Sequence, residues 1–256
     1  MKIRVLKQAF LASVAMAFAA TSSLAATATD PVLAEVTTGE WRSADEKSRD
    51  AARKPIENLQ FWGLKPGASI LEVQPGAGWW TRILAPYAAR TGGRYSATAA
   101  DLANPSITEA ARKGRADFAA RFADDKIYGK VELVNWGATA APLPTNSYDF
   151  ILLSRVIHGW MRVDGLVDRN FASLAGSLKP GGVLLMLVKP QFELQPENIG
   201  KNGLVKDPAM YPVIEKRIRT SLSELGLKVT GWYDSAIDGG DGNREFFVQA
   251  TKPLED

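Results

Sequence analysis

The feature that most constrains the fold of this chain is an alternation of short apolar segments with longer helical ones. The segments SILEV at 69–73, YDFILL at 148–153 and GVLLMLV at 182–188 are almost uninterrupted by polar residues. Strands of this kind are typical of a parallel sheet that helices cover on both faces. The pattern therefore predicts an α/β fold with a seven-stranded, mostly parallel sheet, in which the other strands lie at 94–99, 131–134, 227–233 and 244–250.

One helix is predicted before the first strand, at 43–64, and others between the strands, at 78–89, 106–122, 164–177 and 207–225. Ser43 and Glu46 have the spacing of a capping box at the start of the first helix, and Pro55 is expected to break or restart it. The Asp/Gly-rich segment DGGDGN at 238–243 joins the final two strands. It predicts a hairpin-like addition at the sheet edge, with the last strand antiparallel.

The N-terminus has the three-part pattern of a secretory signal peptide at residues 1–25. Basic residues come first, an apolar run follows from Ala9 to about Ala20, and Ser23 and Ala25 match an A-x-A-like cleavage site. The alternative is a buried N-terminal helix. The signal predicts a periplasmic or secreted protein, with a linker at 26–42 and one domain at 43–256.

The charge balance argues against a nucleic-acid partner. The chain has 31 basic and 28 acidic residues, and removal of residues 1–25 deletes Lys2, Arg4 and Lys7, so that 28 of each sign remain. Nucleic-acid binders usually carry a basic excess.

No later apolar run is long enough to cross a bilayer, so no stable membrane span is expected after cleavage. With one histidine and no cysteine, no metal site is predicted, and the sequence does not indicate an oligomeric state.

The segment ILEVQPGAGWW at 70–80 is predicted to be a strand followed by a ligand-binding turn. Gly76 and Gly78 allow a tight turn that a ligand can approach closely. Glu72 places beside the turn a carboxylate that suits a cationic group or ribose hydroxyls. The third glycine of a dinucleotide fingerprint is missing. Asp101, after the next strand, either accepts from ribose hydroxyls or caps a helix before Pro105.

Together with SYDFILLSRVIHGW and LKPGGVLLMLV, these motifs resemble the class I S-adenosylmethionine-dependent methyltransferases over roughly residues 43–250. The resemblance implies a Rossmann-like fold and S-adenosylmethionine as cofactor. It implies that Glu72, Gly76 and Gly78 line the methionine end and that Asp101 meets the ribose. Gln74 replaces the first glycine of the family motif. The expected cofactor contacts also include Pro75, Ala77, Ser154 and Trp136, of which Trp136 either stacks on the adenine or packs in the core.

Two subgroups of that family resemble different parts of the chain. The first two thirds are similar to exported bacterial predicted methyltransferases, which share an Arg-x-x-His-x-Trp turn, here Arg155 to Trp160. The last third resembles the hemolysin-like TlyA ribosomal-RNA 2'-O-methyltransferases, whose Lys-Asp-Lys-Glu set matches here at Lys189 and Glu245. Ser154 falls on or near the position of the aspartate, so weak or absent RNA activity is expected.

His158 is a candidate general base for the reaction, because its usual pKa suits proton transfer near neutrality. A structural histidine near Trp160 is the alternative. Trp79, Trp80 and Trp160 are expected to form aromatic walls for an apolar or flat acceptor, although core packing is the commoner role of tryptophan. The sequence thus predicts a methyltransferase for a small-molecule acceptor, with catalytic residues His158, Lys189 and Glu245. An inactive binding protein of the envelope and a TlyA-type enzyme are the alternatives.

Overall fold

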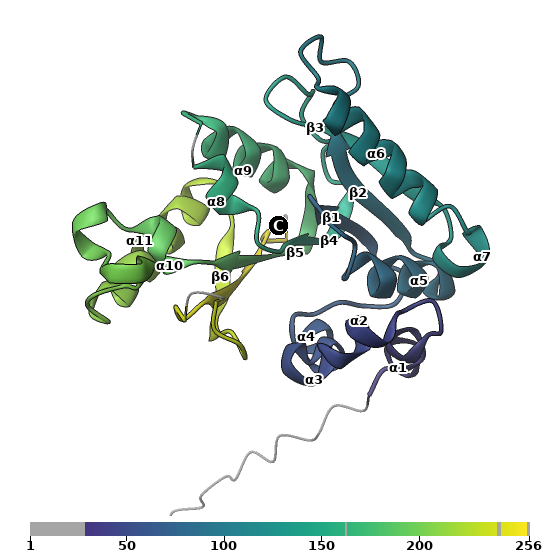
Figure 1. The fold of residues 1–256 in the computed structure, drawn as a ribbon, viewed down its shortest axis with the longest axis horizontal. Helices are drawn as coiled ribbons and strands as arrows, with labels where there is room; N and C mark the ends of the chain where they lie inside the picture. The colour runs from purple at the N-terminus through teal and green to yellow at the C-terminus, as the bar shows by residue number, and fades with distance from the viewer. Residues whose placement is uncertain (1–28, 162, 240–241, 255–256) are drawn as a thin grey trace, which may run out of the picture.

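The computed structural model describes residues 29–161, 163–239 and 242–254, so the predicted signal peptide lies outside the described residues. Its centre is a seven-stranded sheet, in the order β3-β2-β1-β4-β5-β7-β6 (Figure 1). The strands are β1 (Ser69–Val73), β2 (Arg94–Ala100), β3 (Val131–Trp136), β4 (Tyr148–Leu153), β5 (Leu178–Val188), β6 (Lys228–Asp234) and β7 (Phe246–Thr251).

The sheet confirms the predicted Rossmann-like fold. Strands β1 to β5 pair in parallel, whereas β7 is antiparallel to both of its neighbours, β5 and β6. The final hairpin does lie at the sheet edge, but β7 enters between β5 and β6, so that β6 is the edge strand.

Alternation of side chains along the strands divides the core into two layers. Leu71 and Ile151 belong to one buried cluster, whereas their neighbours Ile70 and Phe150 belong to the other. This alternation explains why the strands are apolar along their whole length, since both faces are covered. One layer is covered by α9 (Leu166–Ser177) and α11 (Met210–Glu224), and the other mainly by α1 (Pro31–Thr38), α4 (Pro55–Phe61), α5 (Thr81–Thr91) and α6 (Glu109–Arg121).

The predicted linker at 26–42 contains a packed helix, and this part of the prediction needs correction. The Asp30 carboxylate caps α1 by accepting from the backbone of Val32 and Leu33, and its second oxygen accepts from the Tyr87 hydroxyl of α5. Leu33 and Val36 are fully buried in the core. The helix is short, so its stability comes from this tertiary packing rather than from local preference.

The predicted helix at 43–64 is divided into three short helices, α2 (Ala44–Ser48), α3 (Asp50–Arg53) and α4. The capping box of Ser43 and Glu46 is confirmed. Lys54 adopts a left-handed conformation with φ of 43°, and Pro55 begins α4. The proline thus restarts the helix, as the sequence predicted.

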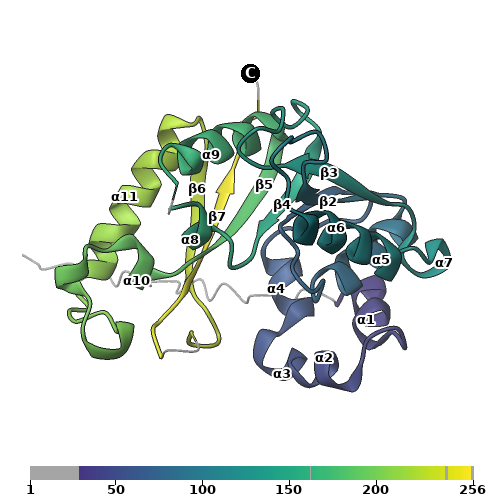
Figure 2. The same ribbon diagram turned by 45° about the horizontal axis from the view of Figure 1, so that its top comes forward.

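The carboxyl ends of the parallel strands meet at one edge of the sheet. Figure 2 shows α2, α3, α4, α10 (Pro190–Glu193) and the connection between β6 and β7 gathered at this side of the molecule. The remaining short elements are α7 (Asp125–Tyr128), α8 (Ile157–Trp160) and the 3₁₀ turns η1 (Pro196–Asn198) and η2 (Lys201–Gly203). Within the described ranges, no helix combines the length and hydrophobicity that a membrane crossing requires.

The packing of α1 predicts a large cost for truncating its core residue. Leu33→Ala should lower the free energy of unfolding by about 2–4 kcal/mol, because it leaves a cavity against α5. Thr38→Ala, on the exposed side of the same helix, should change it by less than about 1 kcal/mol. Urea denaturation of the full chain measures both. Equal unfolding midpoints for the two variants would show that residues 31–38 are an unpacked leader.

Candidate functional site

The turn after β1 is fixed by two hydrogen bonds of Gln74. Its backbone N–H donates to the Thr98 hydroxyl on β2 (2.8 Å), and its side-chain oxygen accepts from the indole N–H of Trp160 (2.9 Å). Gln74 adopts a left-handed backbone with φ of 49°, a conformation that glycine adopts more easily. The glutamine side chain thereby links this turn to α8.

The two glycines of the turn serve different purposes. Both have positive φ, 59° at Gly76 and 83° at Gly78. A Cβ at Gly78 would lie 2.4 Å from the Phe122 ring, so Gly78 is required by packing. A Cβ at Gly76 would meet nothing within 4 Å, so this position faces open space that a ligand can use. The Ala77 carbonyl accepts from Arg82 and Arg121, and Ala77 does not line that space.

Glu72 lies below the turn, which differs from its predicted place beside the ligand. Its carboxylate is 2% exposed and accepts from the hydroxyls of Thr81 (2.8 Å) and Tyr95 (2.6 Å). Burial raises the pKa of this carboxyl to about 7, and the two hydrogen bonds offset the burial in part. The side chain therefore anchors the start of α5 to β1 and β2 from inside the core.

A first hollow, of about 410 Å³, lies beside the turn on the side of β2 and β3. Gln74, Pro75 and Gly76 form one wall, and Trp136 at the end of β3 forms another. Trp136 is largely buried against Trp160, with ring centroids 5.9 Å apart, and it also lines the hollow. Its stacking on an adenine stays a prediction.

Asp101 is placed as a turn residue at the end of β2. Its carboxylate accepts from the backbone N–H of Ala103 (2.9 Å), and it does not line the first hollow. Arg115 of α6 lines the hollow instead, and donates to the carbonyl of Ala100 (2.8 Å) and the side chain of Asn135 (2.9 Å). The alternative that Asp101 caps a helix is wrong, because the next helix, α6, begins at Glu109 and is capped by Thr108. The contact of Asp101 with a ribose stays a prediction.

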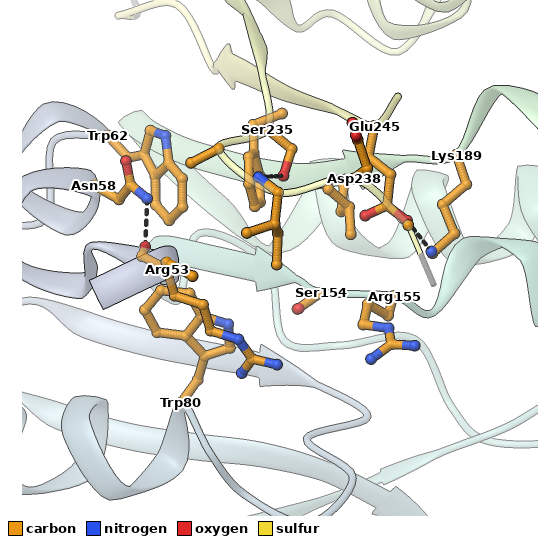
Figure 3. Close-up of a pocket in the computed structure, with 16 residues that line it drawn as sticks. Arg53, Asn58, Trp62, Trp80, Ser154, Arg155, Lys189, Ser235, Asp238 and Glu245 are labelled. Carbon is orange, nitrogen blue, oxygen red and sulfur yellow. Dashed lines mark hydrogen bonds and ion pairs between the residues drawn. The ribbon is translucent and has the colours of Figure 1, made fainter. Parts of the chain in front are cut away.

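A second hollow, of about 290 Å³, lies on the side of β4, β5 and β7 (Figure 3). Trp62 and Trp80 contribute aromatic walls, and Ser154 marks the end of β4. Lys189 follows β5, and Glu245 precedes β7. Since β7 runs antiparallel, its first residue lies at the same edge as the last residue of β5, and the two side chains form an ion pair.

The Lys189–Glu245 pair brings together two residues that the sequence assigned to one catalytic set. Their side chains are 11% and 6% exposed, so the pair is almost completely enclosed. Ser154, which the sequence placed among the cofactor contacts, lines this second hollow and not the first one. An enclosed ion pair is costly to break, because a charge left without its partner is poorly solvated.

The structure does not bring His158 to this hollow. His158 lies in α8, where its ring stacks on Phe192 with centroids 4.9 Å apart, and it lines neither hollow.

The three tryptophans that were expected to form aromatic walls have different positions. Trp80 lines the second hollow, whereas Trp79 packs under Arg53 and Trp160 packs in the core.

Two residues of the second hollow received no role from the sequence. Arg53 at the end of α3 and Arg155 in the turn after β4 both line it. Arg155 belongs to the Arg-x-x-His-x-Trp turn, and its position after a parallel strand was the signal that could have identified it. Arg53 has no comparable signal, because it reaches the hollow through the packing of α3.

In the described part of the chain, no three His, Asp or Glu side chains are grouped as a metal site.

Comparisons with known proteins agree with this architecture. Residues 71–186 match the family described as "Methyltransferase domain". "Putative rRNA methyltransferase YqxC" of Bacillus subtilis is 41% identical over 78 residues, which cover 30% of this chain and 28% of that protein. The ubiquinone/menaquinone biosynthesis C-methyltransferase UbiE of Shewanella pealeana is 31% identical over 138 residues, which cover 53% and 49%. The chain thus matches about half, or less, of the length of these relatives.

A solved structure supports the fold independently. The crystal structure of a SAM-dependent methyltransferase from Aquifex aeolicus has a TM-score of 0.52 and 20% identity, and covers 80% of this chain and 93% of that one. This structure confirms the predicted Rossmann-like methyltransferase fold, and the family match over residues 71–186 agrees with the predicted resemblance to class I methyltransferases. The resemblances to the two subgroups stay predictions.

The buried Glu72 predicts an unusual dependence of stability on pH. A carboxyl whose pKa is raised by folding contributes stability that is complete below pH 4.5 and is lost as the pH rises through 7. Relative to Glu72→Gln, the wild-type protein should lose on the order of 3 kcal/mol of unfolding free energy between pH 4.5 and pH 8. Urea denaturation across this range measures the difference. Glu57→Gln, on the exposed surface of α4, is the matched control, and parallel curves for wild type and Glu72→Gln would contradict the assignment.

Proposed function

We propose, from the premise that this chain carries a class I S-adenosylmethionine-dependent methyltransferase domain, that it transfers a methyl group to a small-molecule acceptor. The observation that carries the proposal is the pair of hollows on either side of the turn after β1. One suits the cofactor and the other suits the acceptor. Such a crevice at the carboxyl ends of the strands is where open α/β sheets bind ligands.

The first hollow has the properties that S-adenosylmethionine requires. Gly76 leaves room at the turn that any side chain would fill, and the Trp136 ring offers a flat apolar surface to an adenine base. Gln74 and Pro75 hold the turn in place beside it. When bound, the cofactor supplies a methyl group on a positively charged sulfur that leaves readily as a neutral thioether. Transfer then depends mainly on alignment, which this rigid turn provides.

The second hollow supplies the groups that an acceptor hydroxyl or amine needs. The acceptor forms its new bond to the methyl carbon while the carbon–sulfur bond breaks, and its own proton must leave. The Glu245 carboxylate can take that proton, and the Lys189 ammonium can hold a developing negative charge on an acceptor oxygen. We assign these roles to the pair rather than to His158, because His158 lies outside the hollow.

A TlyA-type RNA 2'-O-methyltransferase is a second candidate. The Lys189–Glu245 pair and the similarity to YqxC favour it. Ser154 opposes it, because a serine cannot orient the lysine as the carboxylate of the RNA enzymes does. The charge balance of the chain also lacks the basic excess of an RNA-binding protein.

Gly76 allows cofactor binding to be tested separately from folding. Gly76→Leu should weaken binding of S-adenosylmethionine at least tenfold in calorimetry, because the new side chain occupies the hollow. Gly92→Leu is the matched control, since Gly92 also has positive φ, 74°, and open space, but ends α5 away from the hollow. Equal losses of affinity in both variants would attribute the effect to backbone strain and not to a cofactor site.

Lys189 allows turnover to be tested separately from cofactor binding. Lys189→Gln should lower transfer of labelled methyl groups at least 100-fold and leave the Kd for S-adenosylmethionine within threefold. Lys179→Gln, at the opposite end of β5, is the control, because Lys179 also forms an ion pair, with Asp149. The acceptors offered are a bacterial small-molecule extract and ribosomal subunits. Label in the RNA would favour the second candidate, and no label in either would indicate a binding protein.

A further inference from the structure

Two arginine side chains of the second hollow have no anionic partner within 29–161, 163–239 and 242–254. Arg53 and Arg155 come from α3 and from the turn after β4, and Figure 3 shows both guanidinium groups at the hollow. No hydrogen bond or ion pair joins either guanidinium group to the described residues. Arg42 and Arg49, in the same N-terminal region, are instead paired with Asp50 and Asp45. The hollow therefore contains positive charge that the protein does not neutralise by direct contact.

The two arginines are held in place in different ways. The Arg53 guanidinium lies over the Trp79 ring, 4.4 Å from its centroid, in a favourable cation–π contact. Arg155 adopts a left-handed backbone with φ of 64°, which costs about 1 kcal/mol or more for a residue other than glycine. Backbone strain of this kind is concentrated at binding and catalytic sites, so the strain at Arg155 points to a position that serves a ligand rather than the fold.

The two charges also oppose each other. The pKa of Arg53 is lowered, first by partial burial and then by the positive charges of Arg49 and Arg155. Asp50, which is paired with Arg42, is the smallest of the named influences and raises the pKa of Arg53. The carboxylates of the hollow are engaged elsewhere, because Glu245 is paired with Lys189 and Asp238 is exposed and interacts with Arg244. An anionic group between the two guanidiniums would remove the repulsion, and Arg binds carboxylate or phosphate with two parallel hydrogen bonds.

The remaining walls of the hollow indicate the chemistry of the rest of the ligand. Trp62 and Trp80 are large, rigid and apolar, and suit a flat or unsaturated skeleton. We infer that the methyl acceptor is a small, flat molecule with a carboxylate or phosphate group, bound through that group by Arg53 and Arg155. Its reacting hydroxyl or amine then faces Lys189 and Glu245. That this ligand is the methyl acceptor rests on the proposed function. The anion-binding site itself rests on the geometry alone.

Binding of three matched probes tests the inference. The probes are 4-hydroxybenzoate, phenyl phosphate and the uncharged 4-hydroxybenzamide, titrated against the full chain by calorimetry and by the fluorescence of the hollow's tryptophans. At least one anion should bind ten or more times as tightly as the amide. The two anions distinguish a carboxylate from a phosphate ligand.

Variants locate the binding. Arg53→Gln and Arg155→Asn should each weaken binding of the preferred anion at least tenfold and change binding of the amide by less than threefold. Asparagine tolerates the left-handed backbone, so Arg155→Asn should keep or raise the melting temperature. Arg49→Gln, which removes a neighbouring charge outside the hollow, should change anion binding by less than threefold.

Several outcomes overturn the inference: absence of binding by both anions, equal affinity for the amide, or undiminished anion binding by Arg155→Asn. Titration of the same proteins with S-adenosylmethionine separates the inference from the proposed function. Cofactor binding without anion binding defeats the inference and leaves methyl transfer intact. Anion binding without cofactor binding defeats the proposed function and leaves the arginine site.

Discussion

The buried carboxyl group of Glu72 is the constraint on which the rest of the site depends. It lies inside the core, where it accepts hydrogen bonds from Thr81 on α5 and Tyr95 on β2. Burial of a carboxyl group without partners would be strongly unfavourable, so the three side chains must keep this arrangement. Because β1, β2 and α5 are thereby joined below the turn, the backbone at Gly76 can face outward and still be rigid.

The fold could be predicted well from the sequence because buried strands consist of apolar residues, and runs of apolar residues are visible in the sequence. The segment 148–153 forms β4 with the same boundaries as predicted. The pattern failed at α1, where the surrounding composition is rich in alanine and threonine and two residues, Leu33 and Val36, carry the packing. A helix this short is stabilised by contacts with α5, and such long-range contacts leave no periodic signal in the local sequence.

The site was predicted in part, for a related physical reason. Lys189 and Glu245 were identified from motifs, but only the antiparallel entry of β7 explains their contact. Gln74 was interpreted as a departure from the family motif, whereas it bonds to Trp160, 86 positions along the chain. His158 was placed near the reaction from its position after β4, but one turn of helix α8 directs it to Phe192. The direction in which a side chain points depends on such turns, and the sequence pattern does not determine their geometry.

The two hollows differ in their relation to the matched domain. The residues of the first hollow all lie within 71–186, the range that matches the methyltransferase family. Most residues of the second hollow lie outside that range: α3 and α4 come before it, and the segments around Lys189, Ser235 and Glu245 come after it. Under the proposed function, the cofactor is bound by the part of the chain that the family shares, and the acceptor by parts that can change independently. Recognition of the proposed acceptor then depends on how α3 and the β6–β7 connection meet across the carboxyl edge of the sheet, where Arg53, Lys189 and Glu245 line the same hollow (Figure 3).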